Sequence, residues 1–148
     1  MRRKQKRGFM ARLLTNLRAG RMQRTLAAAT ALTAPPLAFE IYLEHYKGSF
    51  GDKWMWTPVF LTPPLTAAAI GGVFSERAAK TALPLVSALY FLDGIAGIVT
   101  HVQGVRKKPG GFSEPSYNLV MGPPLLAPGA LLLIGGFGML APLMKREH

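Results

Sequence analysis

Four apolar segments constrain this chain more than any other feature. Each contains about 20 mostly apolar residues, which is the length an α-helix needs to cross a bilayer. The segments are residues 25–46, 54–74, 81–103 and 119–144. A soluble domain of 148 residues could not cover them, because almost no polar face is left on these helices. The sequence therefore predicts an all-α integral membrane domain over residues 25–146, built as a four-helix bundle.

The distribution of positive charge predicts how this bundle is oriented. Nine of the 18 lysines and arginines lie in residues 1–24, which we expect to form a basic segment in the cytoplasm or on the membrane surface. With the N-terminus inside, 13 basic residues fall on the cytoplasmic side and 5 on the outer side. Basic residues that flank spans concentrate in the cytoplasm, so the bias predicts an N-in, C-in topology. The basic cluster at residues 106–108 departs from this rule.

Part of the basic segment has an amphipathic pattern. On a helix, four apolar residues form one face: Met10, Leu13, Leu14 and Leu17. Arg12 and Arg18 lie off this face. This pattern is typical of a helix on an anionic membrane surface, although a positive tail that only fixes topology fits equally well. No acid precedes Glu40, and such an acid-free, arginine-rich start also resembles a mitochondrial presequence. The bacterial cytoplasmic membrane is the expected location, and the mitochondrial inner membrane is the minor alternative.

Several function classes are excluded by composition. The chain has no cysteine, which excludes disulfides and thiolate metal sites. Its basic residues flank apolar runs instead of covering a soluble core, so no nucleic-acid partner is expected. The sequence has no nucleophile with a base and no phosphate-binding glycine loop. We therefore do not expect the chain to be catalytic by itself.

A weak internal repeat divides the chain into two helical hairpins. His45 and His101 each lie at the outer end of the first helix of a hairpin. The pairs Pro63–Pro64 and Pro123–Pro124 are expected within the second helices. Such a pattern indicates either a parallel repeat or coincidence in a proline-rich chain.

The third span carries the most informative ionisable group. Asp93 lies near the middle of the membrane, where an acid is costly and has few structural uses. It shares one helical face with five other residues: Tyr90, Gly94, Gly97, His101 and Gly104. The glycines either pack against another helix or let a flat ligand approach the backbone.

The first span supplies further polar residues near the outer surface. Glu40 and Glu44 are one turn apart, with Glu40 about 9 Å from the end of the span. Glu44 is expected to be hydrated. His45 is expected at the same depth as His101, because both spans end on the outer side.

One hypothesis for this pair of histidines is a haem b or quinone site. His45 and His101 would ligate the iron axially, and Gly97 would leave space for the ring. Arg106 would pair with a propionate. Such a protein is usually a membrane anchor that passes electrons between a quinone and a soluble dehydrogenase.

Three other hypotheses stay open. His45 and His101, joined by Glu44 and Asp93, would form a metal site. Glu40 and Asp93 would be the titrating groups of a small proton-coupled transporter. A cofactor-free scaffold or assembly subunit would use its polar residues only for packing.

Two stretches carry a resemblance to a known group of proteins. They are Glu-His-Tyr-Lys-Gly-Ser-Phe at residues 44–50 and Tyr-Asn-Leu-Val-Met-Gly-Pro-Pro at residues 117–124. Over residues 25–146 the chain resembles small, uncharacterised four-span bacterial membrane proteins. The resemblance implies a small subunit of a larger redox complex, with a periplasmic oxidoreductase as partner. The outer loop, residues 104–118, contains the basic cluster at residues 106–108, so an acidic partner is expected to dock there.

Overall fold

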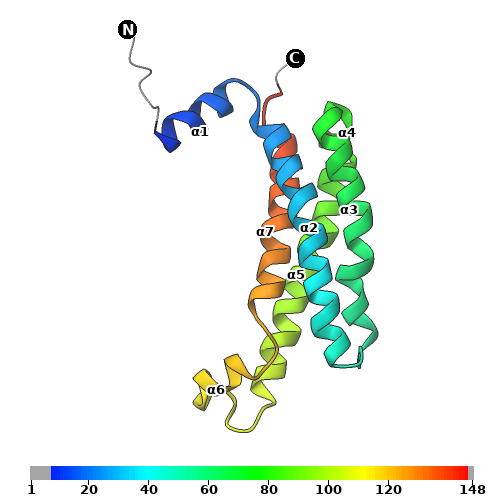
Figure 1. Ribbon diagram of the computed structural model, residues 1–148, viewed down its shortest axis with the longest axis vertical. Coiled ribbons are helices and arrows are strands. Elements are labelled where there is room, and N and C mark those ends of the chain that lie inside the picture. The colour runs from blue at the N-terminus through cyan, green and yellow to red at the C-terminus, as the bar shows by residue number, and fades with distance from the viewer. Residues whose placement is uncertain (1–7, 147–148) are drawn as a thin grey trace.

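Four long helices form a bundle in the computed structural model of the chain, which describes residues 8–146 (Figure 1). They are α2 (Met22–Lys47), α3 (Thr57–Phe74), α5 (Ala82–Arg106) and α7 (Leu126–Leu140). Six short helices complete the described chain: α1 (Phe9–Arg18), η1 (Lys53–Trp56), α4 (Glu76–Lys80), η2 (Gly111–Ser113), α6 (Pro115–Val120) and η3 (Ala141–Leu143). Residues 1–7, the start of the predicted basic segment, and residues 147–148 lie outside the description.

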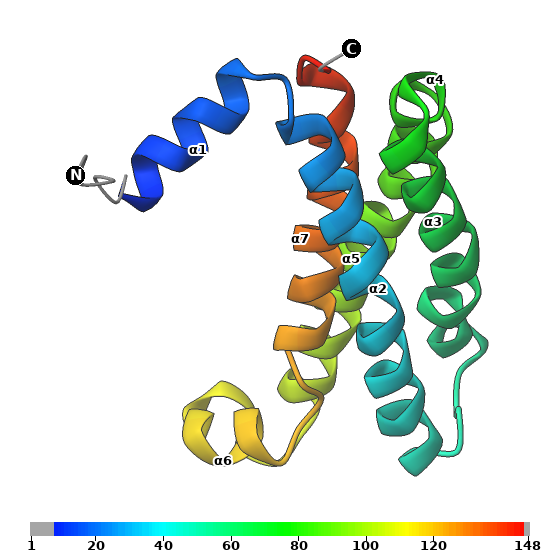
Figure 2. The same ribbon diagram turned by 45° about the horizontal axis from the view of Figure 1, so that its top comes forward.

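The predicted class is confirmed. Over the described residues the fold is all-helical, and four segments are long and apolar enough to cross a membrane. The start of α2, the end of α7 and α4 lie at the same end of the bundle (Figures 1 and 2). The charge bias predicts that this end faces the cytoplasm, and we call it the inner end. The opposite, outer end contains η1 and α6.

The contacts between helices fix their order around the bundle. The α2 helix packs mainly on α3 and α7, and α5 packs mainly on the same two helices. The two helices that carry His45 and His101, α2 and α5, therefore face each other diagonally across the bundle.

Glycines allow α5 and α7 to approach closely. A Cβ atom at Gly94 would lie 2.9 Å from the side chain and 3.0 Å from the backbone nitrogen of Leu132. A Cβ atom at Gly135 would lie 2.9 Å from backbone atoms of both Ser87 and Phe91. Small residues at a helix interface let backbones pack closely in a membrane. These glycines therefore serve packing, one of the two roles expected from the sequence.

The fourth span differs from the prediction. A continuous helix over residues 119–144 is wrong, since α6 ends at Val120 and α7 begins only at Leu126. Pro123–Pro124 lie in the break instead of inside the helix, whereas Pro63–Pro64 lie inside α3. Proline has no N–H to donate, and it disfavours helical conformation in the preceding residue. The two hairpins are correspondingly unequal, and the expected placement of the second proline pair is wrong.

A polar clamp closes the inner end of the bundle. The buried Gln23 side chain donates to two carbonyl oxygens in residues 141–144, over 3.2 and 3.3 Å. The Arg146 guanidinium donates to the Gln23 amide oxygen (3.2 Å) and to the carbonyls of Gly72 (2.9 Å) and Val73 (2.7 Å). These carbonyls at the end of α3 lack an intrahelical partner. The clamp therefore ties α2, α3 and the C-terminal segment together.

The clamp generates a prediction about stability. Replacing Arg146→Ala leaves partly buried carbonyls without a donor, which costs about 1–3 kcal/mol per group. We expect a lower unfolding midpoint in detergent, measured by loss of helical circular dichroism on heating or in denaturant. The exposed neighbour in Lys145→Ala provides the control and should leave the midpoint unchanged. Equal effects of the two substitutions would contradict the clamp.

Candidate functional site

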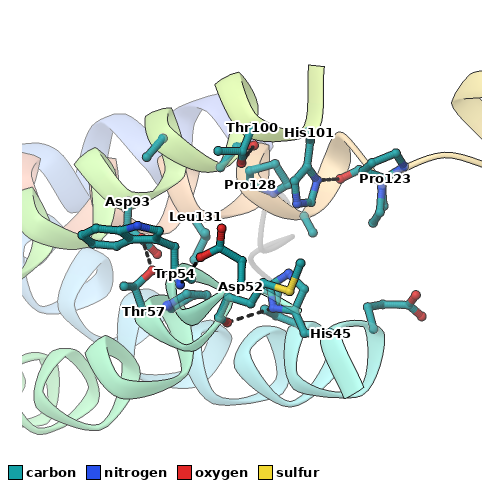
Figure 3. Close-up of a pocket in the computed structure, with 18 of the residues that line it drawn as sticks. His45, Asp52, Trp54, Thr57, Asp93, Thr100, His101, Pro123, Pro128 and Leu131 are labelled. Carbon is teal, nitrogen blue, oxygen red and sulfur yellow. Dashed lines mark hydrogen bonds between the residues drawn. The ribbon is translucent and has the colours of Figure 1, made fainter. Parts of the chain in front are cut away.

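A pocket of about 680 Å³ lies between the outer halves of the helices (Figure 3). Its walls are the end of α2, η1, the first turn of α3, the outer part of α5 and the start of α7 with the break before it. Much of the lining is apolar, including Ile41, Pro58, Ala96, Ala127 and Leu131. A cavity of this size and character, with a few convergent polar groups, is typical of a small-molecule site.

The structure brings the two predicted histidines together in this pocket. His45 enters from α2 and His101 from α5, and the centres of their rings are 6.4 Å apart. The ring planes are nearly perpendicular, at 79°. Figure 3 shows the two side chains on opposite walls of the pocket.

Backbone carbonyls hold both imidazole rings. The Nδ1 atom of His45 lies 2.9 Å from the carbonyl oxygen of Met55, and that of His101 lies 2.7 Å from the carbonyl oxygen of Pro124. A carbonyl only accepts, so each Nδ1 carries the hydrogen. Within residues 8–146 no hydrogen bond reaches either Nε2 atom. In the neutral ring this atom has a lone pair that can accept a proton or bind a metal.

Asp93 forms the deep end of the pocket. It lies eight residues before His101, or about 12 Å further along the helix. Its Oδ1 atom is 2.5 Å from the Thr57 hydroxyl, and its Oδ2 atom is buried with no hydrogen-bond partner in the described chain. The Thr57 hydroxyl also lies 2.7 Å from the carbonyl oxygen of Trp54, and it has one proton for two acceptors. When that proton goes to Trp54, the Asp93 carboxyl must itself be the donor.

Prolines occupy the space beside two glycines of the predicted face. A Cβ atom at Gly97 would lie 2.8 Å from Pro128, and one at Gly104 would lie 2.7 Å from Pro123. Gly97 lines the pocket, but the space beside its backbone, which we expected to hold a haem ring, is taken by Pro128.

The other predicted site residues lie at the edge of the pocket or outside it. Glu44 lines the pocket and forms an ion pair with Lys47. Tyr90 is fully buried, and its hydroxyl is hydrogen-bonded to that of Thr62 over 3.2 Å. Glu40 and Arg106 are exposed and do not line the pocket, so Glu40 is not brought together with Asp93.

Sequence reasoning missed the contribution of the loop after α2. Asp52 and Trp54 line the pocket, and the Asp52 carboxylate accepts a hydrogen bond from the backbone N–H of Trp54 over 3.0 Å. Phe50 has a left-handed backbone (φ 46°) and stacks on Trp56, with ring centres 3.8 Å apart. This fold of the loop places the Met55 carbonyl beside His45. The aromatic residues of this loop are the available signal in the sequence, but such residues are also typical of a membrane interface.

The charges of the lining are all acidic. Glu44, Asp52 and Asp93 contribute carboxyl groups, and no lysine or arginine of residues 8–146 lines the pocket. No group of three or more His, Asp or Glu residues in the described part of the chain could hold a metal ion. The structure thus gathers no third ligand around His45 and His101 among the described residues, and the metal site stays a prediction.

Comparison with known proteins adds no relative. No family model matches the chain, and no curated protein or solved structure was found to be similar to it. Any functional conclusion rests on the geometry and chemistry of the pocket.

The shared hydroxyl proton of Thr57 generates a second prediction. We expect a carboxylic acid C=O band that disappears in Asp93→Asn and shifts in Thr57→Val, because the valine removes the hydrogen bond. Infrared spectroscopy of the protein in detergent across a range of pH measures the band. Thr100→Val, another pocket-lining threonine whose hydroxyl bonds only the Gly97 carbonyl, should leave it in place. An unshifted band in Thr57→Val would refute the coupling.

Proposed function

We propose that this chain is a small membrane subunit that binds a quinol in the outer pocket and passes its electrons to a partner protein. One observation carries the proposal. Two histidines, each oriented by a backbone carbonyl, share an apolar pocket and have Nε2 atoms without a hydrogen-bond partner in the described structure. Each neutral ring can take one proton, and a quinol releases two on oxidation.

The charge of the lining favours a neutral ligand. A quinol ring and its isoprenoid tail are apolar, and its two hydroxyls are hydrogen-bond donors. The carboxylates of Glu44 and Asp52 would repel an anionic ligand, and no lysine or arginine among the described residues lines the pocket. Acceptors without a partner, such as the Asp93 Oδ2 atom and the two Nε2 atoms, suit donor groups on the ligand.

The proposed reaction balances as quinol to quinone with release of two protons and two electrons. The Nε2 atoms of His45 and His101 accept the hydroxyl protons, and the Nδ1–carbonyl bonds keep the rings in position. Glu44, at the pocket edge, passes protons to water. The electrons go to a redox centre on a partner protein. The resemblance noted in the sequence favours a periplasmic oxidoreductase as this partner, with the chain itself in the bacterial cytoplasmic membrane.

Haem b is a second candidate, favoured by the two histidines on opposite walls of the pocket. The Nε2 atoms of both histidines would be available to hold its iron, which would supply one-electron transfer. The rings of His45 and His101 are 6.4 Å apart. The acidic lining and the position of Pro128 beside Gly97 weigh against a haem with its propionates.

The transporter and scaffold hypotheses receive less support. The transporter needs Glu40 and Asp93 in one path, and Glu40 lies on the outside of the bundle. A cofactor-free scaffold would not need two oriented histidines in an open pocket.

Quinol binding is testable through the two tryptophans of the chain. Trp54 lines the pocket and Trp56 is its near neighbour, so a bound quinone should quench their fluorescence. We expect saturable quenching by a short-tailed quinone or quinol in nanodiscs. His45→Ala and His101→Ala should each weaken binding about tenfold, which corresponds to one hydrogen bond of about 1.4 kcal/mol. Gln103→Ala, at an exposed position on the same turn of α5 as His101, is the control.

An optical spectrum of the same preparation separates the alternatives. A Soret band that disappears in both histidine variants would establish the haem and overturn quinol binding as the role of these residues. Quinone affinity that is unchanged in both variants would also overturn the proposal. A featureless spectrum without quenching would leave the scaffold as the better explanation.

A further inference from the structure

The first helix stands apart from the bundle. Figures 1 and 2 show α1 leaving the inner end sideways, away from the four long helices. The chain turns at Gly20, whose positive φ of 71° is the left-handed conformation that glycine adopts most readily after a helix. Gly20 is itself buried, so the turn is part of the packed structure. The direction of α1 is thereby set by the fold.

The position of this turn places α1 at the surface of the membrane. The 26 residues of α2 extend about 39 Å, which exceeds a hydrocarbon core of about 30 Å. The first residues of α2 therefore reach the headgroup region. A helix that runs sideways from that point lies along the plane of the inner membrane surface.

Three apolar side chains of α1 that the structure describes are exposed. Phe9, Met10 and Leu14 are 77%, 64% and 49% exposed. They fall within one arc of the helix, and the hydroxyl of Thr15 lies on the opposite side, bonded to the Ala11 carbonyl over 2.7 Å. A helix with one apolar and one polar side is suited to an interface between oil and water.

The charge of this region identifies the surface that covers it. Arg12 and Arg24 are exposed, and the sequence has no acid before Glu40. Residues 1–7 add five further basic residues. Clusters of basic residues next to a span bind anionic lipid headgroups, and each contributes roughly 1 kcal/mol near the surface.

We propose that α1 binds the anionic inner surface of the membrane as an interfacial helix. Its apolar side enters the boundary of the acyl chains, and its arginines contact lipid phosphate groups. The inference does not depend on the proposed quinol site, which lies at the opposite end of the bundle.

The absence of cysteine makes a direct test simple. Leu14→Cys and Thr15→Cys introduce single spin labels on the apolar and polar sides of α1 in otherwise cysteine-free protein. Nanodiscs of phosphatidylcholine with phosphatidylglycerol are compared with phosphatidylcholine alone, and collisions with oxygen and with a water-soluble nickel complex are measured. In the anionic bilayer the label at residue 14 should meet mainly oxygen, and the label at residue 15 mainly nickel.

Removal of charge tests the role of the arginines. Adding Arg12→Gln to the Leu14→Cys variant should lower the ratio of membrane-bound to detached α1 about fivefold, from the contribution of one arginine. Nickel access at residue 14 in the anionic bilayer would overturn the proposal. Equal protection in both lipids, unchanged by Arg12→Gln, would overturn the role of anionic headgroups. Dipolar broadening between labels would indicate a second copy of the chain as the cover instead.

The fluorescence of Trp54 and Trp56 reports on the fold during this test. Both residues lie at the outer end of the bundle, remote from α1. An unchanged emission spectrum in the cysteine and glutamine variants shows that any change in label accessibility comes from α1 and not from unfolding.

Discussion

The close approach of α5 and α7 is the contact on which the rest of this structure depends. Lipid tails are as apolar as leucine, so helices in a membrane associate through close packing and not through removal of apolar surface from water. Gly94 and Gly135 make that packing tight enough to bring the backbones together. Because α7 is held against α5, the proline-rich break before α7 lies along the outer end of α5, where the Pro124 carbonyl meets His101.

The polar groups at the two ends of the bundle differ in whether they have hydrogen-bond partners. At the inner end, Gln23 and Arg146 satisfy carbonyls that the helix ends leave without partners. At the outer end, two imidazole nitrogens and a buried oxygen of Asp93 have no partner in the described structure. Buried polar groups normally find partners, and exceptions concentrate at functional sites. Thr66, Ser87 and Asn118 also bury a side-chain oxygen without a partner in the described structure, but only Asp93 of these four lines the pocket with the two histidines.

The diagonal arrangement of α2 and α5 explains how one pocket receives both histidines. Neighbouring helices such as α5 and α7 pack too closely to leave a cavity, whereas diagonal helices are separated by the width of the bundle. The Met55 and Pro124 carbonyls then orient His45 and His101 from the loop and the break. The same irregular backbone that interrupts the spans thus supplies the acceptors that fix the histidine rings. Such backbone is tolerated at membrane depth where it lines a cavity.

The sequence by itself determined the all-α class, the presence of four apolar spans and the similar depth of His45 and His101. These properties follow from composition and from position along each helix. It did not determine which helix faces which, because the rotation of one helix relative to another depends on side-chain packing. The tertiary structure therefore decided that Glu40 lies outside the pocket, that Pro128 fills the space beside Gly97, and that Thr57 is the partner of Asp93.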